Sequence, residues 1–203
     1  MANYTIKKEG KIFKKDFEYS EVTDDLDNLQ NEDFNISTIR QITLWKLDRY
    51  VSLDKKVIKK INNLKSLTEF DEKKTKNVLK DLLACEGVGL PMASTYLRFR
   101  NPHVFQIIDA RAYRAAFDYE VNEVLSSSDK SKLIDIYIEY IEKLREIAQK
   151  GYHGLSVKFE DLDRFLYVID KKAGFIVNED KNKSYDSSKI EKWKELICNP
   201  EEI

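Results

Sequence analysis

The residues of this sequence best suited to chemistry are the run Gly87-Val88-Gly89 and the carboxylate of Asp109. Two glycines around one apolar residue allow a tight turn and let another backbone approach closely. A helix that starts just after such a turn has unsatisfied N–H groups in its first turn, and these groups bind an anion such as a phosphate. Val88 would then fill the space between the flanking helices, and Ala93 would let them cross closely.

The same segment also fits an ordinary helical hairpin with a glycine turn, and the residues alone leave both interpretations open. A dinucleotide-binding turn does not fit. Gly87-Val88-Gly89 would need a third small residue at Met92, and no strand pattern precedes the glycines.

Asp109 follows the apolar end of the segment 101–108 and stands where a helix is expected to begin. A carboxylate in a cleft can activate water or stabilise a sugar cation. Aspartate is also a favoured N-cap residue. For Asp109 taken alone, the N-cap interpretation is favoured.

The rest of the chain predicts an all-α fold, because Gly (6) and Pro (3) are scarce and charged segments carry apolar residues at helical spacing. We expect an N-terminal arm over residues 1–32 and a helical domain over residues 33–203. The expected helices cover 37–51, 55–67, 68–84 (opened by a capping box at Thr68 to Asp71), 91–99, a helix from Asp109, 129–150, 159–171 and 188–197. The side chains expected to face inward are Ile39, Leu44, Leu47, Val51, Val57, Ile58, Ile61, Leu64, Val78, Leu79, Leu82, Leu83, Leu133, Ile134, Tyr137, Ile138, Ile141, Leu144 and Ala148.

Bulk properties narrow the class of protein. With 35 basic and 36 acidic side chains the net charge is -1, so overall charge does not favour binding to nucleic acid. Any contact with DNA would need a local cluster of suitably positioned groups. Cys85 and Cys198 are too few for an iron–sulfur cluster and form no CxxC pair for zinc, and His103 and His153 are too isolated for a metal site. No stretch approaches the roughly 18 apolar residues of a membrane span. We expect a cytoplasmic protein, associated with the nucleoid if the source is prokaryotic.

A hairpin, a spacer and then an aspartate at a helix start resemble the helix-hairpin-helix DNA glycosylase superfamily, which includes endonuclease III, adenine glycosylase and 8-oxoguanine glycosylase. The resemblance is detailed over residues 79–117, whereas the surrounding helices fit only in number and length. Gly87, Val88 and Gly89 match the hairpin that grips the phosphate backbone, and Asp109 matches the catalytic aspartate. The resemblance implies two helical lobes around a cleft, and a monomer that acts on duplex DNA with the target nucleotide flipped out.

The resemblance also implies roles for neighbouring residues. Backbone carbonyls of Leu83, Cys85 and Val88 would hold a monovalent cation, Na⁺ or K⁺, and no other cofactor is required. Arg111 and Arg114 would support the aspartate or reach phosphates, and a solvated helix face is an equally good interpretation of both.

Pro91 departs from the family pattern. Bifunctional members carry a lysine at this position, whose amine forms a Schiff base with the sugar. Proline has no such amine, so the sequence predicts a monofunctional DNA glycosylase of base excision repair, without strand cleavage, whose hairpin including Pro91 contacts DNA. Lys80 could in principle supply an amine, although nothing in the sequence places it near Asp109. The alternatives are a non-catalytic DNA-binding protein with the same fold and a helical domain that binds other proteins.

The base pocket is not defined by the sequence. Tyr96, Trp45, Phe117 and Tyr119 are candidates for stacking on a base, although each is better suited to the core. Gln41 is a candidate wedge in the duplex, and Asp163 a candidate pocket residue.

Overall fold

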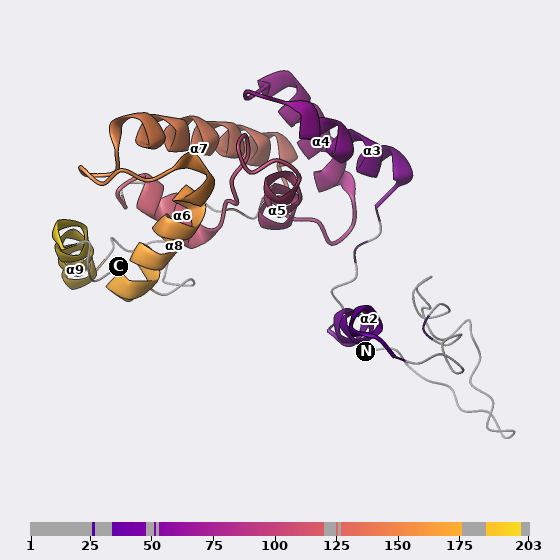
Figure 1. Cartoon of the computed structure of the whole chain (residues 1–203), viewed down its shortest axis with the longest axis horizontal. Helices are drawn as coiled ribbons and strands as arrows, with labels where there is room; N and C mark the ends of the chain where they lie inside the picture. Colours follow the sequence, from indigo (N-terminus) through magenta and orange to yellow (C-terminus); the bar gives the residue numbers. More distant parts are fainter. Residues whose placement is uncertain are drawn as a thin grey trace, which may run out of the picture. The chain divides into compact units, whose positions relative to one another are not determined.

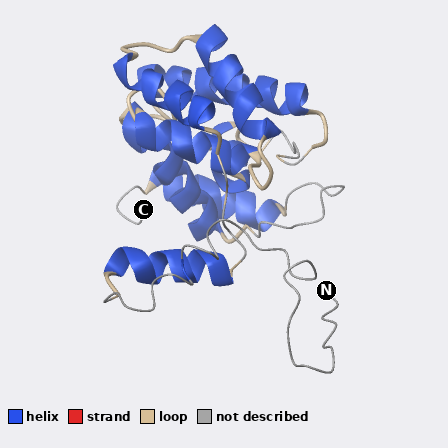
Figure 2. Cartoon of the chain, turned by 90° about the vertical axis from the view of Figure 1, so that its right-hand side faces the viewer, coloured by secondary structure: helices blue, strands red, loops and turns tan. Residues whose placement is uncertain are grey.

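The computed structural model describes residues 26, 34–47, 51, 53–119, 125, 127–175 and 186–199. The chain divides into two units, Met1–Val51 and Ser52–Ile203. Within the described residues the regular elements are helices, together with one isolated bridge between Tyr152 and Leu155 (Figure 2). The predicted all-α class is confirmed. Apart from Leu26, the predicted arm over residues 1–32 lies outside the described residues.

The first unit contains helix α2 (Ile36–Lys46), which the sequence had assigned to the helical domain. The side chain of Asn35 caps it by accepting the amides of Ser37 and Thr38. The helix is shorter than predicted, and its apolar side chains do not form the expected inward face: Ile39, Leu44 and Leu47 are exposed, and Val51 is half-buried. That prediction was wrong because apolar spacing identifies a face of a helix without identifying what covers it.

The second unit carries the remaining described helices (Figure 1), and α4 packs against α7 in it. Helix α6 packs on α8, and α8 packs on α9. The helices are α3 (Lys55–Asn63), η3 (Leu64–Ser66), α4 (Glu72–Ala84), α5 (Leu90–Arg100), α6 (Ala110–Ala116), α7 (Lys130–Lys150), η4 (Phe159–Asp161), α8 (Leu162–Ala173) and α9 (Ser187–Cys198).

The core of this unit includes the apolar faces of α4 and α7, together with buried side chains of α5, α6 and α8. All of the side chains predicted to face inward on α4 are buried, and so are those on α7 except Ala148, which is half-buried. Burial of each such aliphatic side chain stabilises the fold by about 1.5–3 kcal/mol. On α3, Val57 is buried and Ile58 is exposed, so the predicted stripe on that helix is only partly correct.

Aspartate marks the start of the helix before the glycine turn. Asp71 caps α4 by accepting the amide of Lys74 at 2.9 Å, so the helix begins at Glu72 and not at the capping box predicted from Thr68. Asp71 has an extended backbone, and its own carboxylate already satisfies one of the free amides of the first turn.

Among the described helices, none has both the length and the apolar composition that crossing a lipid bilayer requires. Both cysteines are free thiols, with Cys85 half-buried and Cys198 exposed.

Candidate functional site

The turn between α4 and α5 covers residues 85–89. Cys85 ends α4, and its carbonyl accepts the amide of Val88 at 3.3 Å. Val88 is buried, as expected of a side chain that fills the base of the turn, whereas Gly87 and Gly89 are exposed. The two glycines, together with the exposed Glu86, are therefore the part of the turn that another molecule can approach.

Gly89 is the N-cap residue of α5, and no side chain caps this helix. The carbonyl of Gly89 accepts the amide of Ala93, while Pro91 has no amide to donate. Within the part of the chain that the structure describes, the amides of Gly89, Leu90 and Met92 have no hydrogen-bond acceptor. Free amides at the start of a helix attract an anion.

The carbonyls expected to hold a monovalent cation end α4 and line the same turn. The carbonyl of Cys85 accepts one hydrogen bond, and those of Leu83 and Val88 accept none from the described residues. Lone pairs are therefore available on all three oxygens. Among the described side chains, no group of three or more His, Cys, Asp or Glu residues could hold a metal ion.

Asp109 is the N-cap residue of α6, and it uses one oxygen for that role. Its Oδ1 accepts the amides of Arg111 and Ala112, each at 2.8 Å. No described residue donates a hydrogen bond to Oδ2. The residue is half-buried, and burial raises the pKa of its carboxyl above the ordinary value of 3.8, helped by the charge of Asp170 and opposed by the two amides and the charge of Arg111.

Capping by aspartate is common in this chain, and Asp109 differs from the other cases in its surroundings. Hydrogen bonds lower the pKa of Asp71 and of Asp186, which cap exposed helix ends. The pKa of Asp109 shifts in the opposite direction, upward, mainly because the carboxyl group is buried. The capping aspartates are Asp54, Asp71, Asp109, Asp129 and Asp186.

The connector that leads from α5 to Asp109 is fixed by side chains from three helices. Ile107 is held at both backbone groups, because its carbonyl accepts the hydroxyl of Tyr140 at 2.9 Å and its amide donates to Asp163 at 3.1 Å. The amide of Ile108 donates to Ser94, and the carbonyl of Gln106 accepts the hydroxyl of Tyr137.

Asp163, a candidate pocket residue in the sequence, therefore holds the connector. It is buried and also lies 3.9 Å from the Nε atom of Arg98. Tyr137 was assigned only to the core by its helical spacing, and Tyr140 was not singled out. No sequence signal indicated that their hydroxyls would hold this connector.

Arg111 and Arg114 share one buried carboxylate. Asp170 on α8 is fully buried and accepts Nε and Nη2 of Arg114. It also accepts Nη1 of Arg111 at 2.7 Å, and the same Nη1 donates to the carbonyl of Phe175. Arg114 is itself buried, so these contacts differ from both the phosphate contacts and the solvated face expected from the sequence. No sequence signal indicated a role for Asp170.

The candidate stacking residues of this unit are mostly engaged in the core. Tyr119 is buried and stacks on Phe175 with ring centroids 4.3 Å apart. Phe117 packs on Tyr113 at 4.8 Å, and Tyr96 is half-buried. The remaining stacking candidate, Trp45, lies on α2 in the first unit, and so does the candidate wedge, Gln41.

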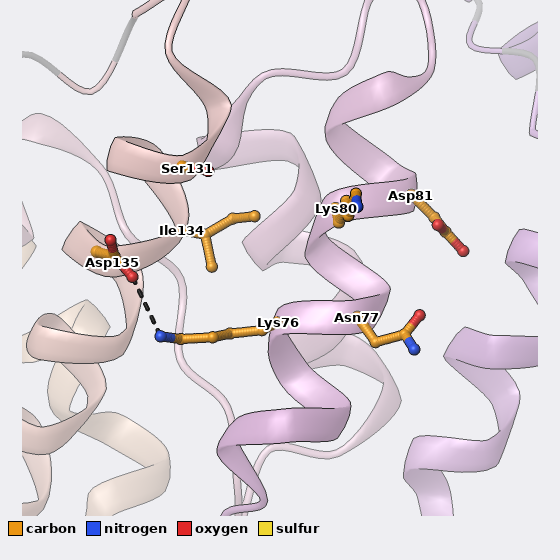
Figure 3. A pocket seen from close by; sticks show the side chains of 7 residues that line it. All are labelled: Lys76, Asn77, Lys80, Asp81, Ser131, Ile134 and Asp135. Carbon is orange, nitrogen blue, oxygen red and sulfur yellow. Dashed lines mark hydrogen bonds and ion pairs between the residues drawn. The ribbon is translucent and has the colours of Figure 1, made fainter.

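Lys80 lines a groove of about 490 Å³ between α4 and α7 (Figure 3). Lys76 reaches across this groove to Asp135 at 3.2 Å, whereas Lys80 has no ion pair with a described residue. Asp109 is not among the residues of the groove, so the structure does not bring Lys80 and Asp109 together there. The groove is lined by Lys76, Asn77, Lys80, Asp81, Ser131, Ile134 and Asp135.

Comparison of the chain with protein-family models, with curated proteins and with solved structures finds no match. A function must therefore be argued from two features of this chain. One is the row of free amides at the start of α5, and the other is the half-buried carboxylate of Asp109 at the start of α6.

Proposed function

We propose that this chain is a DNA repair protein, a monofunctional DNA glycosylase that flips a damaged or mispaired base out of the duplex and excises it by hydrolysis. In this proposal the second unit is the two-lobed, monomeric helix-hairpin-helix fold, and Asp109 lies at the edge of its cleft. The observation that carries the proposal is that Asp109 fixes one carboxylate oxygen by capping and leaves Oδ2 without a hydrogen bond from the described residues.

DNA binding in this proposal uses the exposed turn with Gly87 and Gly89. A backbone phosphate accepts the free amides of Gly89, Leu90 and Met92, and the partial positive charge at the start of α5 strengthens the contact. A Na⁺ or K⁺ ion held by the neighbouring carbonyls would add positive charge beside the phosphate. Arg111 and Arg114 have no part in this contact, because their guanidinium groups bind Asp170.

The chemistry follows from the position of Asp109. As the N-glycosidic bond breaks, the base leaves with the bonding electrons and takes up a proton, and positive charge develops on the sugar. Ionised Oδ2 stabilises that charge while water adds to the sugar carbon and gives its proton to solvent. Pro91 offers no amine for a Schiff base, so the product is an abasic site in an intact strand.

The test is base release, measured by mass spectrometry, from duplexes that carry a panel of damaged bases. Asp109→Asn is the matched variant, because asparagine caps a helix as well as aspartate does and only the charge is lost. We expect release by the native chain and none by the variant. Release that persists in Asp109→Asn would exclude Asp109 as the catalytic group.

A second candidate function is DNA binding without catalysis. The observation that favours it is that Asp109 already has a structural role, since it caps α6 as other aspartates cap other helices. Under this alternative the chain binds duplex DNA and releases no base from any duplex in the panel.

Gly89→Asp tests DNA binding for both candidates. Aspartate at this N-cap position would accept amides of α5, so we expect the fold to keep its stability. The added negative charge beside the phosphate site should abolish binding to a fluorescent duplex at low salt. Gly89→Ala is the control and should bind as the native chain does. Equal affinity of Gly89→Asp and the native chain would remove the turn from the proposal.

A further inference from the structure

Helix α3 and the following turn η3 carry a dense local positive charge in a chain that is nearly neutral overall. Residues 55–66 contain five lysines and no acidic residue, whereas the whole chain has a net charge of -1. A nearly neutral chain attracts a polyanion only where basic groups are gathered, and this segment is such a place. The lysines are Lys55, Lys56, Lys59, Lys60 and Lys65.

Most of this charge lies on one side of α3, which we call the α3 face. Positions 59, 62 and 63 are four, seven and eight residues beyond position 55, so all four share one side of the helix, and position 56 adjoins them. Every side chain of the α3 face is exposed. The face consists of Lys55, Lys56, Lys59, Asn62 and Asn63.

The three lysines of the α3 face form no ion pair with a described residue. Lys60, at the edge of the face, differs in this respect because its ammonium group binds Asp81 on α4. The acidic residues nearest in the sequence lie beyond both ends of the segment. Asp54 caps α3 by accepting the amide of Lys56 at 2.6 Å, and Glu69 follows η3. The charge of the three lysines is therefore available to a partner.

The α3 face is carried by the same group of packed helices as the glycine turn. Helix α3 packs on both α4 and α5, the two helices that the turn joins. The end of α3 is also fixed to the end of α5, because the side-chain amide of Asn101 donates to the carbonyls of Leu64 at 3.0 Å and Leu67 at 2.9 Å. The lysines and the free amides of α5 thus belong to one packed unit.

We propose that the α3 face is a second contact of this chain with DNA, and that its lysines bind phosphates of the duplex backbone. Lysine and asparagine side chains donate hydrogen bonds to phosphate oxygens, and such contacts position a protein on DNA without reading its sequence. The inference rests on the proposed function only in that the partner is DNA. The face adds to the glycine turn and does not replace it, since three lysines alone hold a duplex weakly.

The packing of α3 favours DNA over an anionic membrane as the partner. A basic amphipathic helix binds a membrane by burying its apolar side in lipid. The apolar side of this helix already packs within the unit, where Val57 and Leu64 are buried. Ile58 is the exposed apolar side chain of α3, and one such side chain is a small anchor.

The test is the salt dependence of binding to a fluorescent duplex of undamaged DNA, measured by anisotropy on the full chain. The triple variant Lys55→Gln, Lys56→Gln, Lys59→Gln should lose affinity on the order of 100-fold at about 50 mM salt. The plot of log affinity against log salt should also become less steep by about three, or about one for each lysine. Unchanged affinity and slope in this variant would overturn the proposal.

The control variant removes the same three charges from exposed positions on α8 and α9. It is the triple variant Lys171→Gln, Lys192→Gln, Lys194→Gln, and it should bind as the native chain does. Equal losses in the two triple variants would show that overall charge attracts DNA, and would overturn the role of the α3 face. Replacing the three α3 lysines by arginine keeps the charge and should retain native binding. Loss of binding in the arginine variant would also contradict the proposal.

Two other polyanions decide whether the partner is DNA. Poly-glutamate has the charge of an acidic protein segment, and vesicles rich in phosphatidylserine have the charge of an anionic membrane. We expect both to bind more weakly than the duplex. If either binds as tightly as the duplex, with the same dependence on the three lysines, the assignment to DNA is wrong.

Separate measurements distinguish this inference from the proposed function. If no duplex loses a base while the α3 variant loses affinity and slope, the glycosylase function fails and the α3 face stands. If base release depends on Asp109 while the α3 variant binds as the native chain does, the α3 face fails and the glycosylase function stands. A native chain that binds no duplex would overturn both.

Discussion

Gly87 and Gly89 lie in one turn, but their backbones differ: φ is +74° at Gly87 and −88° at Gly89. The first value lies in the left-handed region that favours glycine, and the second is open to any residue. The two glycines thus serve different purposes. Gly87 makes the turn possible, and Gly89 leaves the start of α5 uncovered.

The first prediction concerns the stability of the turn. Gly87→Ala should lower the free energy of unfolding by about 1–2 kcal/mol, because alanine is strained in the left-handed region. Gly89→Ala should have a much smaller effect, since an added Cβ would meet the ring of Pro91 at 3.8 Å, an ordinary contact. Urea denaturation of the two variants checks this. Equal destabilisation by both substitutions would contradict the conclusion that Gly87, and not Gly89, needs the left-handed backbone conformation.

The second prediction concerns Asp109 and pH. Burial raises its folded-state pKa above 3.8, so the ionised form is less favourable in the folded chain than in the unfolded chain. Its contribution to stability is present below pH 3.8 and is lost as pH rises through the folded pKa. Asp109→Asn does not titrate, so the variant should be at least as stable as the native chain at pH 7, with the difference shrinking toward pH 4.

Denaturation curves at several pH values measure this difference. A variant that is clearly less stable than the native chain at pH 7 would show that the attraction of Asp109 to Arg111 outweighs its burial.

The third prediction concerns the attachment of α9. The buried hydroxyl of Tyr152 donates to the carbonyl of Ala115 at 2.7 Å and accepts the indole N–H of Trp193 at 3.1 Å. Tyr152→Phe leaves both groups without a partner and should cost about 1–3 kcal/mol. Thermal unfolding measures the loss of stability. A shift of the Trp193 indole proton in the NMR spectrum shows that the change occurs at the contact between Tyr152 and Trp193. Tyr167→Phe, at a partly exposed ring on α8, is the control and should have little effect.

The fourth prediction compares a side chain that was correctly predicted to be buried with one that was wrongly predicted to be buried. Leu79 on α4 is fully buried, so Leu79→Ala should cost about 2–5 kcal/mol. Ile58 on α3 is 43% exposed, and Ile58→Ala should cost much less. Chemical denaturation of both variants provides the comparison. Similar losses would show that Ile58 packs as the helical spacing had predicted.

Local signals in the sequence predicted the helix starts near the candidate site. The segment before Asp109 is apolar and aspartate is a good cap, and the structure has Asp109 as the N-cap of α6. The glycine turn was likewise predicted between two helices. These features depend on residues only a few positions apart, so local sequence patterns are enough to predict them.

The charge network around Asp109 could not be predicted in the same way. Arg114 and Asp170 are 56 residues apart in the chain, and no local pattern relates them. Each residue alone looks like part of a solvated helix face. Only the packing of α6 on α8 makes them partners. Burial, helped by the charge of Asp170, raises the pKa of Asp109. The exposed apolar side chains of α2 illustrate the same limit, since spacing does not identify the neighbours of a face.

The pairing of α6 with α8 also constrains the order of assembly during synthesis. Helix α6 has 7 residues, fewer than the roughly 12–15 that an isolated helix needs for even marginal stability in water. Its two arginines lack their buried carboxylate until Asp170 has been made, and Arg111 also needs the carbonyl of Phe175. On the ribosome, the segment with Asp109 would therefore be completed late, after α8 has emerged, although it stands near the middle of the chain.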